Sequence, residues 1–322
     1  MKPTPTPSAI DLEEAIAESR TLNEGLERLL ASQPSVHTIP AAVVRAVRRE
    51  GRGVFPAPMF LPEAREVSIA GRRGAVKLRV LAPRSRPATG VYLHLHGGGW
   101  MLGEADLQDR DLSALAEATG LLTASVEYRL APEHPYPAGP DDCEDAARWL
   151  VTTGAAELGA PSRFFIGGES AGAHLSVVTL LRLRDRHGLG GAFRAANLVY
   201  GSYDLSMTPS QRLWGDRNLV LSDPILRYFY DAFLPGLSPE ERRAPDISPL
   251  FADLRGMPPA LFTVGTLDPL LDDTLFMEAR WRAAGGSTKL HVWPESIHGF
   301  DAFPSRMSTA ARATMAEYLT SA

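Results

Sequence analysis

The sequence predicts an α/β fold, in which a mostly parallel central sheet is flanked by helices and covered by a helical cap. From residue 66 onward, short apolar runs with the two-residue period of strands alternate with longer runs that have the period of helices. Such alternation is typical of a parallel sheet with helices on both faces. Residues 205–256 break the alternation, because they are rich in aromatic residues and prolines. This segment predicts a helical insertion, which would form the cap together with the N-terminal helices.

Composition and charge are those of an ordinary globular protein. The chain has 322 residues, of which 44% are hydrophobic and 22% charged, and its net charge of −5 argues against binding to nucleic acid or anionic membranes. The single cysteine, Cys143, excludes an internal disulfide, fits a reducing compartment and is expected to be structural. No apolar run approaches the ~18 residues of a membrane span, and the proline-rich residues 1–7 lack the apolar core of a secretory signal. We therefore expect a cytoplasmic protein without a membrane span, with a disordered lead-in at residues 1–7.

The N-terminal part, residues 1–55, is predicted to contribute helices to the cap. Residues 11–31 carry an apolar stripe at helical spacing, with acidic residues early and Arg28 late, which favours a helix. Residues 40–50 predict a second, shorter helix that ends at Gly51. Three prolines between residues 56 and 62 then indicate a loop that crosses to the sheet.

The α/β core is predicted in two parts, residues 56–204 and 257–322, on either side of the insertion at residues 205–256. Its first two strands alternate polar and apolar residues and are joined by a turn between Gly71 and Gly74. The expected strands are residues 67–69, 75–81, 91–95, 121–126, 164–166, 195–200, 260–264 and 289–293. The expected helices of the core are residues 107–119, 141–151, 173 to about 186, 274–284 and a final helix to residue 319.

Glycines surround one serine at a predicted strand-to-helix junction. Gly168, Ser170 and Gly172 follow the apolar residues 164–166 and precede a predicted helix, which is the pattern of a nucleophile elbow. A serine lifted clear of both elements needs a sharp turn, and glycines two residues away let neighbouring backbone pass closely. The following helix would direct its amide groups and positive dipole end at the site. The alternative is a glycine-rich turn whose serine only caps the helix.

Two further residues could complete a catalytic relay with Ser170. A serine hydroxyl needs a base to take its proton, usually a histidine held by a carboxylate. Asp268 and His298 each follow a predicted later strand, in the chain order expected for a serine elbow. Asp272 and Asp273 compete for the carboxylate role, but we expect both to lie on a helix and face away. Six other histidines are expected in packed, solvated or mid-strand positions: His37, His94, His134, His174, His187 and His291.

A glycine-rich run after the strand at residues 91–95 could supply oxyanion donors. His96 is followed by three glycines and Trp100. Bare glycine amides can approach a substrate oxygen closely, and such donors typically contribute a few kcal/mol of transition-state stabilisation. The alternative, a merely flexible turn, is disfavoured because the run directly follows a strand and accompanies the serine motif.

These motifs resemble the hormone-sensitive-lipase-like branch of the α/β-hydrolases, which includes bacterial carboxylesterases. The matching segments occur in the family's order, at residues 96–100, 128–138, 167–172, 268–272 and 298–300. The resemblance implies an α/β-hydrolase fold with Ser170 as nucleophile, His298 as base and Asp268 as its orienting carboxylate. It also implies an oxyanion hole formed by the amides of Gly98, Gly99 and Ala171, with His96 bracing the loop.

The chain departs from the family's pattern at three places. Glu169 stands where Asp is usual, Ala173 replaces a common glycine, and residues 201–204 lack a frequent proline. None of these changes removes a catalytic group. The extra methylene of Glu169 lies beside the nucleophile, and its partner is left open by the sequence.

The expected function is that of a serine carboxylesterase acting on short- to medium-chain acyl or aryl esters, without metal or cofactor. Trp100 and Trp214 are expected to bound the pocket for this small-molecule substrate. An amidase, deacetylase or lactonase could use the same residues. A non-catalytic receptor is a further alternative, since plant gibberellin receptors resemble this family but have lost the histidine that corresponds to His298. The resemblance also suggests a homodimer through an edge strand.

Overall fold

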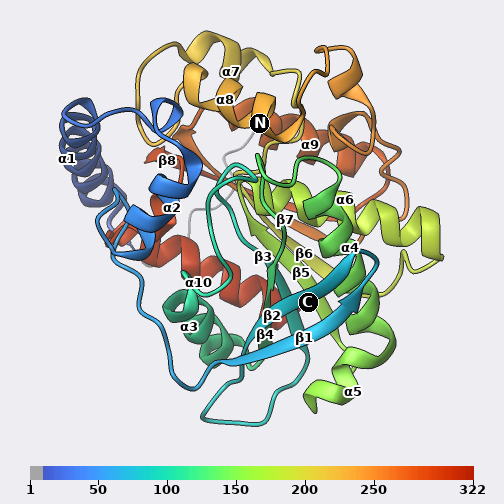
Figure 1. Ribbon diagram of the computed structural model, residues 1–322. Coiled ribbons are helices and arrows are strands. Elements are labelled where there is room, and N and C mark those ends of the chain that lie inside the picture. Colours follow the sequence, from blue (N-terminus) through green and yellow to red (C-terminus); the bar gives the residue numbers. More distant parts are fainter. Residues whose placement is uncertain (1–9) are drawn as a thin grey trace.

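The computed structural model describes residues 10–322, so the expected lead-in at residues 1–7 lies outside the described part. An eight-stranded sheet forms its centre, in the order β1-β2-β4-β3-β5-β6-β7-β8 (Figure 1). The six strands from β4 to β8 are mutually parallel, whereas β2 pairs antiparallel with both β1 and β4. The strands are β1 (Arg65–Gly71), β2 (Gly74–Leu81), β3 (Val91–Leu95), β4 (Leu122–Glu127), β5 (Phe164–Glu169), β6 (Phe193–Val199), β7 (Ala260–Leu267) and β8 (Thr288–Ile297). The prediction of a mostly parallel α/β sheet is confirmed.

Helices cover both faces of this sheet. Side chains alternate along the buried strands: Leu93 and Ile166 join the hydrophobic cluster beneath α4, α6 and α9, whereas Tyr92 and Phe165 join the cluster beneath α10. The core helices are α3 (Asp109–Thr119), α4 (Ala138–Trp149), α5 (Ala155–Leu158), α6 (Ala171–His187), α9 (Leu271–Ala283) and α10 (Arg306–Ser321), with a π-helical turn at Leu150–Gly154 after α4. Cys143 is buried in α4, where burial raises the pKa of its thiol.

Among residues 10–322, every helix is too short or too polar to cross a membrane.

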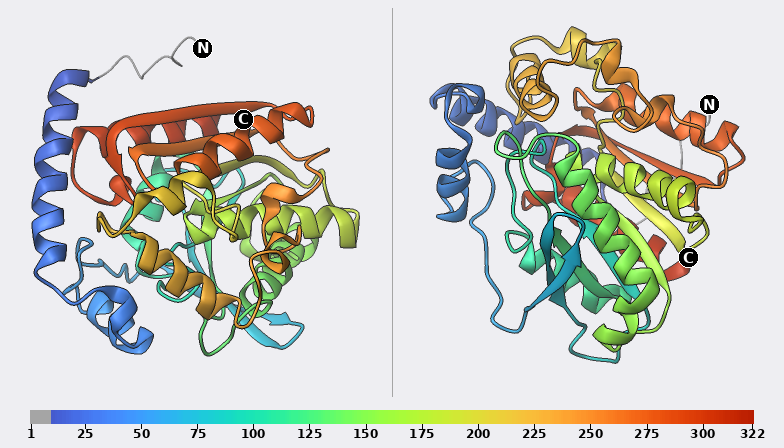
Figure 2. Two further views of the ribbon diagram at one scale, coloured as in Figure 1. Left: turned by 90° about the horizontal axis from the view of Figure 1, so that it is seen from above. Right: turned by 45° about the vertical axis from the view of Figure 1, so that its right-hand side comes forward.

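The N-terminal helices contact both the core and the loop after β3. Helix α1 (Leu12–Ala31) begins at Asp11, whose carboxylate accepts the amides of Glu13 and Glu14. It lies beside the outer strand β8, as the left view of Figure 2 shows, and Asn23 donates to the carbonyl of Glu295 at 2.8 Å. After the 3₁₀ turn η1 (Val36–Thr38), α2 (Ala41–Arg49) reaches the loop after β3, since Arg45 Nε donates to the carbonyl of Met101 at 2.7 Å.

The segment at residues 205–256 lies over the carboxyl ends of the strands, at the top of Figure 1. It contains α7 (Pro209–Trp214), α8 (Asp223–Phe233), η3 (Glu241–Arg243) and η4 (Pro249–Phe251), joined by loops. Its base is fixed by the buried carboxylate of Asp273 in α9. That carboxylate accepts hydrogen bonds from Thr208 and Gln211, and from the amides of Tyr203 and Asp204.

The last strand extends further than the sequence indicates. The sequence predicts a strand over residues 289–293. In the structure β8 continues to Ile297, with a shift of register opposite Gly265. A Cβ atom on Gly265 would lie 2.0 Å from the carbonyl oxygen of Ser296, so the glycine lets the two strands approach. As a result His298 directly follows a strand at the edge where the site lies.

Candidate active site

Ser170 occupies a sharp turn between β5 and α6. Its φ of +57° lies in the left-handed region, which non-glycine residues rarely adopt. A Cβ atom on Gly168 would lie 1.9 Å, and one on Gly172 1.8 Å, from the carbonyl oxygen of Leu95. Both glycines are therefore required for β3 to pass the turn. The Ser170 side chain makes no capping hydrogen bond, so the helix-cap interpretation finds no support here.

Three distant side chains meet at this turn. His298 Nε2 lies 2.9 Å from Ser170 Oγ, and His298 Nδ1 lies 2.9 Å from Asp268 Oδ2. A carboxylate only accepts, so Nδ1 carries the proton and Nε2 of the neutral ring can accept the serine hydroxyl. Asp268 is 1% exposed, and its other oxygen accepts the amide of Leu270 at 2.8 Å. The carboxylate is thus locked against the imidazole and shielded from water.

The two competing carboxylates point elsewhere. Asp272 accepts the amide of Ser210 at 2.8 Å, in the insertion. Asp273 takes part in the network at the base of the insertion, as described above. Of the three candidate acids, the structure brings only Asp268 within hydrogen-bonding distance of His298.

Tyr200 contacts the imidazole and was missed by sequence analysis. Its ring centroid lies 4.6 Å from that of His298, and its hydroxyl donates to Asp301. Tyr200 directly follows β6, so its position at the carboxyl edge of the sheet was the available signal. Its ring packs against His298 and limits the orientations open to the imidazole.

The loop after β3 has the conformation that its glycines permit. Gly98, Gly99 and Trp100 all have positive φ values, of 119°, 60° and 58°. Within residues 10–322, the amides of Gly98, Gly99 and Ala171 donate to no protein acceptor. Three backbone donors are therefore available beside the turn that carries Ser170.

His96 braces this loop from the side. Its ring stacks on Tyr128 with centroids 4.1 Å apart, and Tyr128 donates its hydroxyl proton to the His96 carbonyl at 2.6 Å. Burial lowers the pKa of His96 to about 4, so the ring is neutral near pH 7. A neutral ring can donate from Nδ1 to the carbonyl of Gly97, at 3.0 Å.

The two tryptophans expected in the pocket lie in different surroundings. Trp100 is 3% exposed, stacks on Phe233 of α8 at 4.8 Å and donates its indole proton to His174 Nδ1 at 3.1 Å. His174 in turn donates to the carbonyl of Ile247 at 2.8 Å, which matches its expected packing role. Trp100 therefore links the glycine loop to the insertion. Trp214 ends α7 and donates to the carbonyl of Arg217 at 2.7 Å, packed beside a different hydrophobic cluster.

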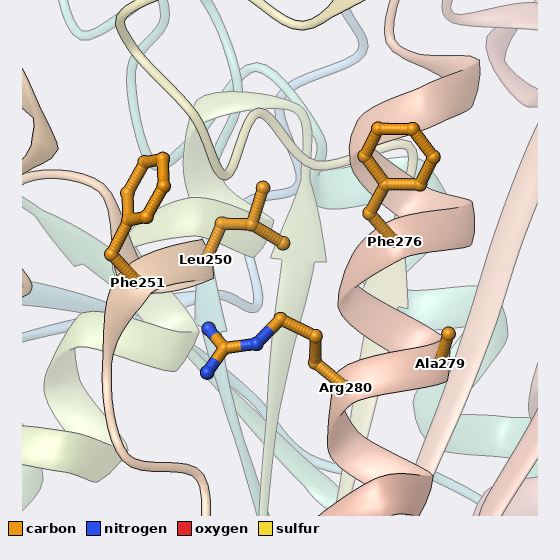
Figure 3. A pocket seen from close by; sticks show the side chains of 5 residues that line it. All are labelled: Leu250, Phe251, Phe276, Ala279 and Arg280. Carbon is orange, nitrogen blue, oxygen red and sulfur yellow. The ribbon is translucent and has the colours of Figure 1, made fainter.

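Three hydrogen-bond donors surround the carboxylate of Glu169, whose partner the sequence does not identify. His94 Nε2 lies 3.0 Å from Oε2, while the Gly97 amide and Gln108 Nε2 lie 2.6 and 2.9 Å from Oε1. The side chain also lines a cavity of about 260 Å³ between the sheet, α3 and α10. Asp301 and Arg312 line the same cavity. A second hollow, of about 480 Å³, lies between η4 and α9 and is lined by none of the three relay residues (Figure 3).

Asp301, which lines this cavity, is expected to make the stability of the folded state depend on pH. Burial raises the pKa of Asp301 to about 6 from an ordinary value of 3.8, and the charges of Glu169 and Asp111 act in the same direction. The folded state therefore binds this proton more tightly than the unfolded state. The resulting stabilisation is complete below about pH 4 and is lost as the pH rises through about 6.

We expect Asp301→Asn to remove this dependence, because the amide cannot titrate but can still accept from Tyr200. The free energy of unfolding of the native chain minus that of the variant should fall from pH 4.5 to pH 7.5, by at most about 3 kcal/mol. Urea unfolding across that range measures the difference. A difference that stays constant with pH would show that Asp301 titrates normally.

Known proteins share this fold and about a third of the aligned residues. Residues 92–302 match a family described by its alpha/beta hydrolase fold. The chain is 36% identical over 296 residues to carboxylesterase NlhH of Mycobacterium tuberculosis, covering 90% of this chain and 92% of that protein. It is 30% identical over 239 residues to an acetyl esterase of Salmonella choleraesuis, covering 74% and 73% of the two chains. A solved esterase of the archaeon Pyrobaculum calidifontis superposes with a TM-score of 0.84 at 27% identity, covering 94% of this chain and 97% of that one.

Proposed function

Because this chain belongs to the hormone-sensitive-lipase-like branch of the α/β-hydrolase family, we propose that it is a carboxylesterase that acts through Ser170. The names of its relatives, carboxylesterase and acetyl esterase, support the reaction class. One observation carries the proposal for the residues: the continuous hydrogen-bonded relay from Ser170 through His298 to Asp268, with both distances at 2.9 Å.

In the proposed reaction, His298 Nε2 takes the hydroxyl proton as Ser170 Oγ attacks the ester carbonyl carbon. Asp268 holds the imidazole in the tautomer that leaves Nε2 free and stabilises the imidazolium that forms. The tetrahedral oxyanion accepts hydrogen bonds from the amides of Gly98, Gly99 and Ala171. His298 then protonates the departing alcohol, which leaves the acyl group on Ser170. In the second half of the reaction, His298 takes a proton from water as the water attacks the acyl carbon, and returns a proton to Ser170 Oγ as the acid leaves.

We further propose that the substrates are short- to medium-chain acyl or aryl esters. An acetyl esterase among the relatives supports a small acyl group. The insertion supports it as well, because the ring of Phe229 would lie only 2.4 Å from a Cβ atom on Gly99. Phe229 thus limits the space beside the proposed oxyanion loop. We propose that Trp100 bounds the pocket on the side of the insertion, since it stacks on Phe233. The role of Trp214 in the pocket, cytoplasmic localisation and homodimer formation stay predictions.

A panel of p-nitrophenyl esters with graded acyl chains tests this substrate class. We expect acetate, butyrate and hexanoate to give a higher kcat/KM than laurate, because a long chain must displace the insertion beside Gly99. The matched anilides and an aliphatic lactone serve as controls for the amidase and lactonase alternatives. Faster turnover of these controls than of every ester would contradict the carboxylesterase assignment.

The receptor alternative needs a separate measurement. A fluorophosphonate probe reacts covalently only with an activated serine, so we expect rapid labelling of the native chain. A receptor with an idle serine would stay unlabelled. The presence of His298 in contact with Ser170 favours labelling.

A further inference from the structure

The Glu169 carboxylate connects three elements around the nucleophile. It accepts hydrogen bonds from His94 of β3, from the amide of Gly97 in the loop after β3, and from Gln108, the residue before α3. The backbone of Glu169 is itself fixed, because it pairs with Val199 in the sheet and directly precedes Ser170. One side chain therefore ties the glycine loop to the turn that carries the nucleophile.

The loop and Glu169 are also in close backbone contact. A Cβ atom on Gly97 would lie 2.8 Å from the carbonyl oxygen of Glu169, so the loop crosses directly over this residue. The next two residues of the loop, Gly98 and Gly99, carry the amides proposed for the oxyanion hole. A change in the position of Gly97 must therefore move these amides relative to Ser170.

The carboxylate is held in its ionised form. Burial by itself would raise the pKa of Glu169, but the charge and hydrogen bond of His94 and the amide of Gly97 lower it below its ordinary value. The other ring nitrogen of His94, Nδ1, lies 2.9 Å from the hydroxyl of Ser125. The hydrogen bonds to a charged carboxylate are among the stronger ones in proteins, which suits them to fixing a loop.

We propose that Glu169 is a positioning residue that sets the distance between the oxyanion-hole amides and Ser170, an inference that rests on the proposed esterase function. Glu169 acts through Gly97 and not on the substrate. Loss of an oxyanion donor, or its displacement by about 1 Å, typically costs on the order of 10²-fold in rate. The effect should fall on the transition state and leave binding of the ground-state ester nearly unchanged.

The test compares Glu169→Ala and Glu169→Gln with the native chain. We measure kcat and KM for p-nitrophenyl butyrate, and the inhibition constant of an aliphatic trifluoromethyl ketone, whose serine adduct has the charged tetrahedral geometry. Glu169→Ala should lower kcat by about 10²-fold and weaken the ketone by a similar factor, with KM changed less than about 3-fold. Glu169→Gln should recover most of the loss, because its amide oxygen can still accept from Gly97.

Glu127→Ala is the matched control. Glu127 accepts the amide of Ala105 at 2.7 Å, so it braces the same loop at a point beyond the glycines. We expect this variant to lose thermal stability while keeping its kcat and ketone affinity. Equal losses of ketone affinity in the Glu127 and Glu169 variants would show that both act only by general stabilisation, and would overturn the proposal.

The outcomes separate this inference from the proposed function. Normal ketone affinity in a folded Glu169→Ala variant overturns the positioning role, whereas the esterase assignment depends on Ser170 alone. If Glu169→Ala does not fold, Glu169→Asp decides, because its carboxylate keeps the charge but sits one methylene closer to the backbone than the one that accepts from His94 and Gly97 in this chain. We expect about a 10-fold loss of kcat and ketone affinity in Glu169→Asp. Native values in that variant overturn the proposal.

Discussion

The Ser170→Ala variant is expected to fold normally and to lose turnover of acetate and butyrate esters by about 10⁶-fold in kcat. The Ser170 hydroxyl is the only group that the structure places within hydrogen-bonding distance of His298 Nε2 among residues 10–322. Without it, the base has no nucleophile to activate. Stopped assays at high enzyme concentration, with a thermal melt to show that the fold is kept, measure the loss.

A matched serine variant controls for this result. Ser125 is also buried and hydrogen-bonded to a histidine, but the other nitrogen of that histidine, His94, contacts the carboxylate of Glu169. Ser125→Ala should keep ester turnover within about 10-fold of the native chain. Residual activity in Ser170→Ala equal to that of Ser125→Ala would remove Ser170 as the nucleophile.

The second large effect is expected for Asp268→Asn, with a loss of about 10⁴-fold in kcat. The Asn side chain keeps the shape but can present its NH₂ group to His298 Nδ1. The imidazole would then carry its proton on Nε2, where it can no longer accept from Ser170. Initial rates with a p-nitrophenyl ester measure the loss, and circular dichroism checks that the fold is kept.

Asp272→Asn is the control for this variant. The two carboxylates are four residues apart, but Asp272 accepts the amide of Ser210, an interaction that the Asn oxygen can keep. We expect Asp272→Asn to retain nearly native kcat. If this variant instead loses as much activity as Asp268→Asn, the choice of Asp268 as the partner of His298 is wrong.

The fold and the relay residues could be predicted because their signals are local. The strand at residues 91–95 was predicted with the bounds that the structure has, since a short apolar run is bounded by Gly90 and the loop glycines. Parallel strands end at one edge of the sheet, so residues that follow successive strands are brought together. This rule places Asp268 and His298 beside Ser170 without any knowledge of long-range contacts.

The remaining features depend on contacts that sequence spacing does not encode. The three donors to Glu169 come from segments 61 to 75 residues away along the chain. Tyr200 and Asp301 are separated by 101 residues, and neither belongs to a motif. Likewise, the position of Trp100 follows from its stacking on Phe233 in the insertion, whose placement over the sheet has no local signal.

The most direct test of the account is to trap the covalent intermediate. We would mix the native chain with p-nitrophenyl acetate, quench in acid within milliseconds and map the acetylated peptide by tandem mass spectrometry. We predict one acetyl group on Ser170 during turnover and no acetylated peptide in the Ser170→Ala variant. Acetylation at another side chain, with Ser170 unmodified during turnover, would contradict it.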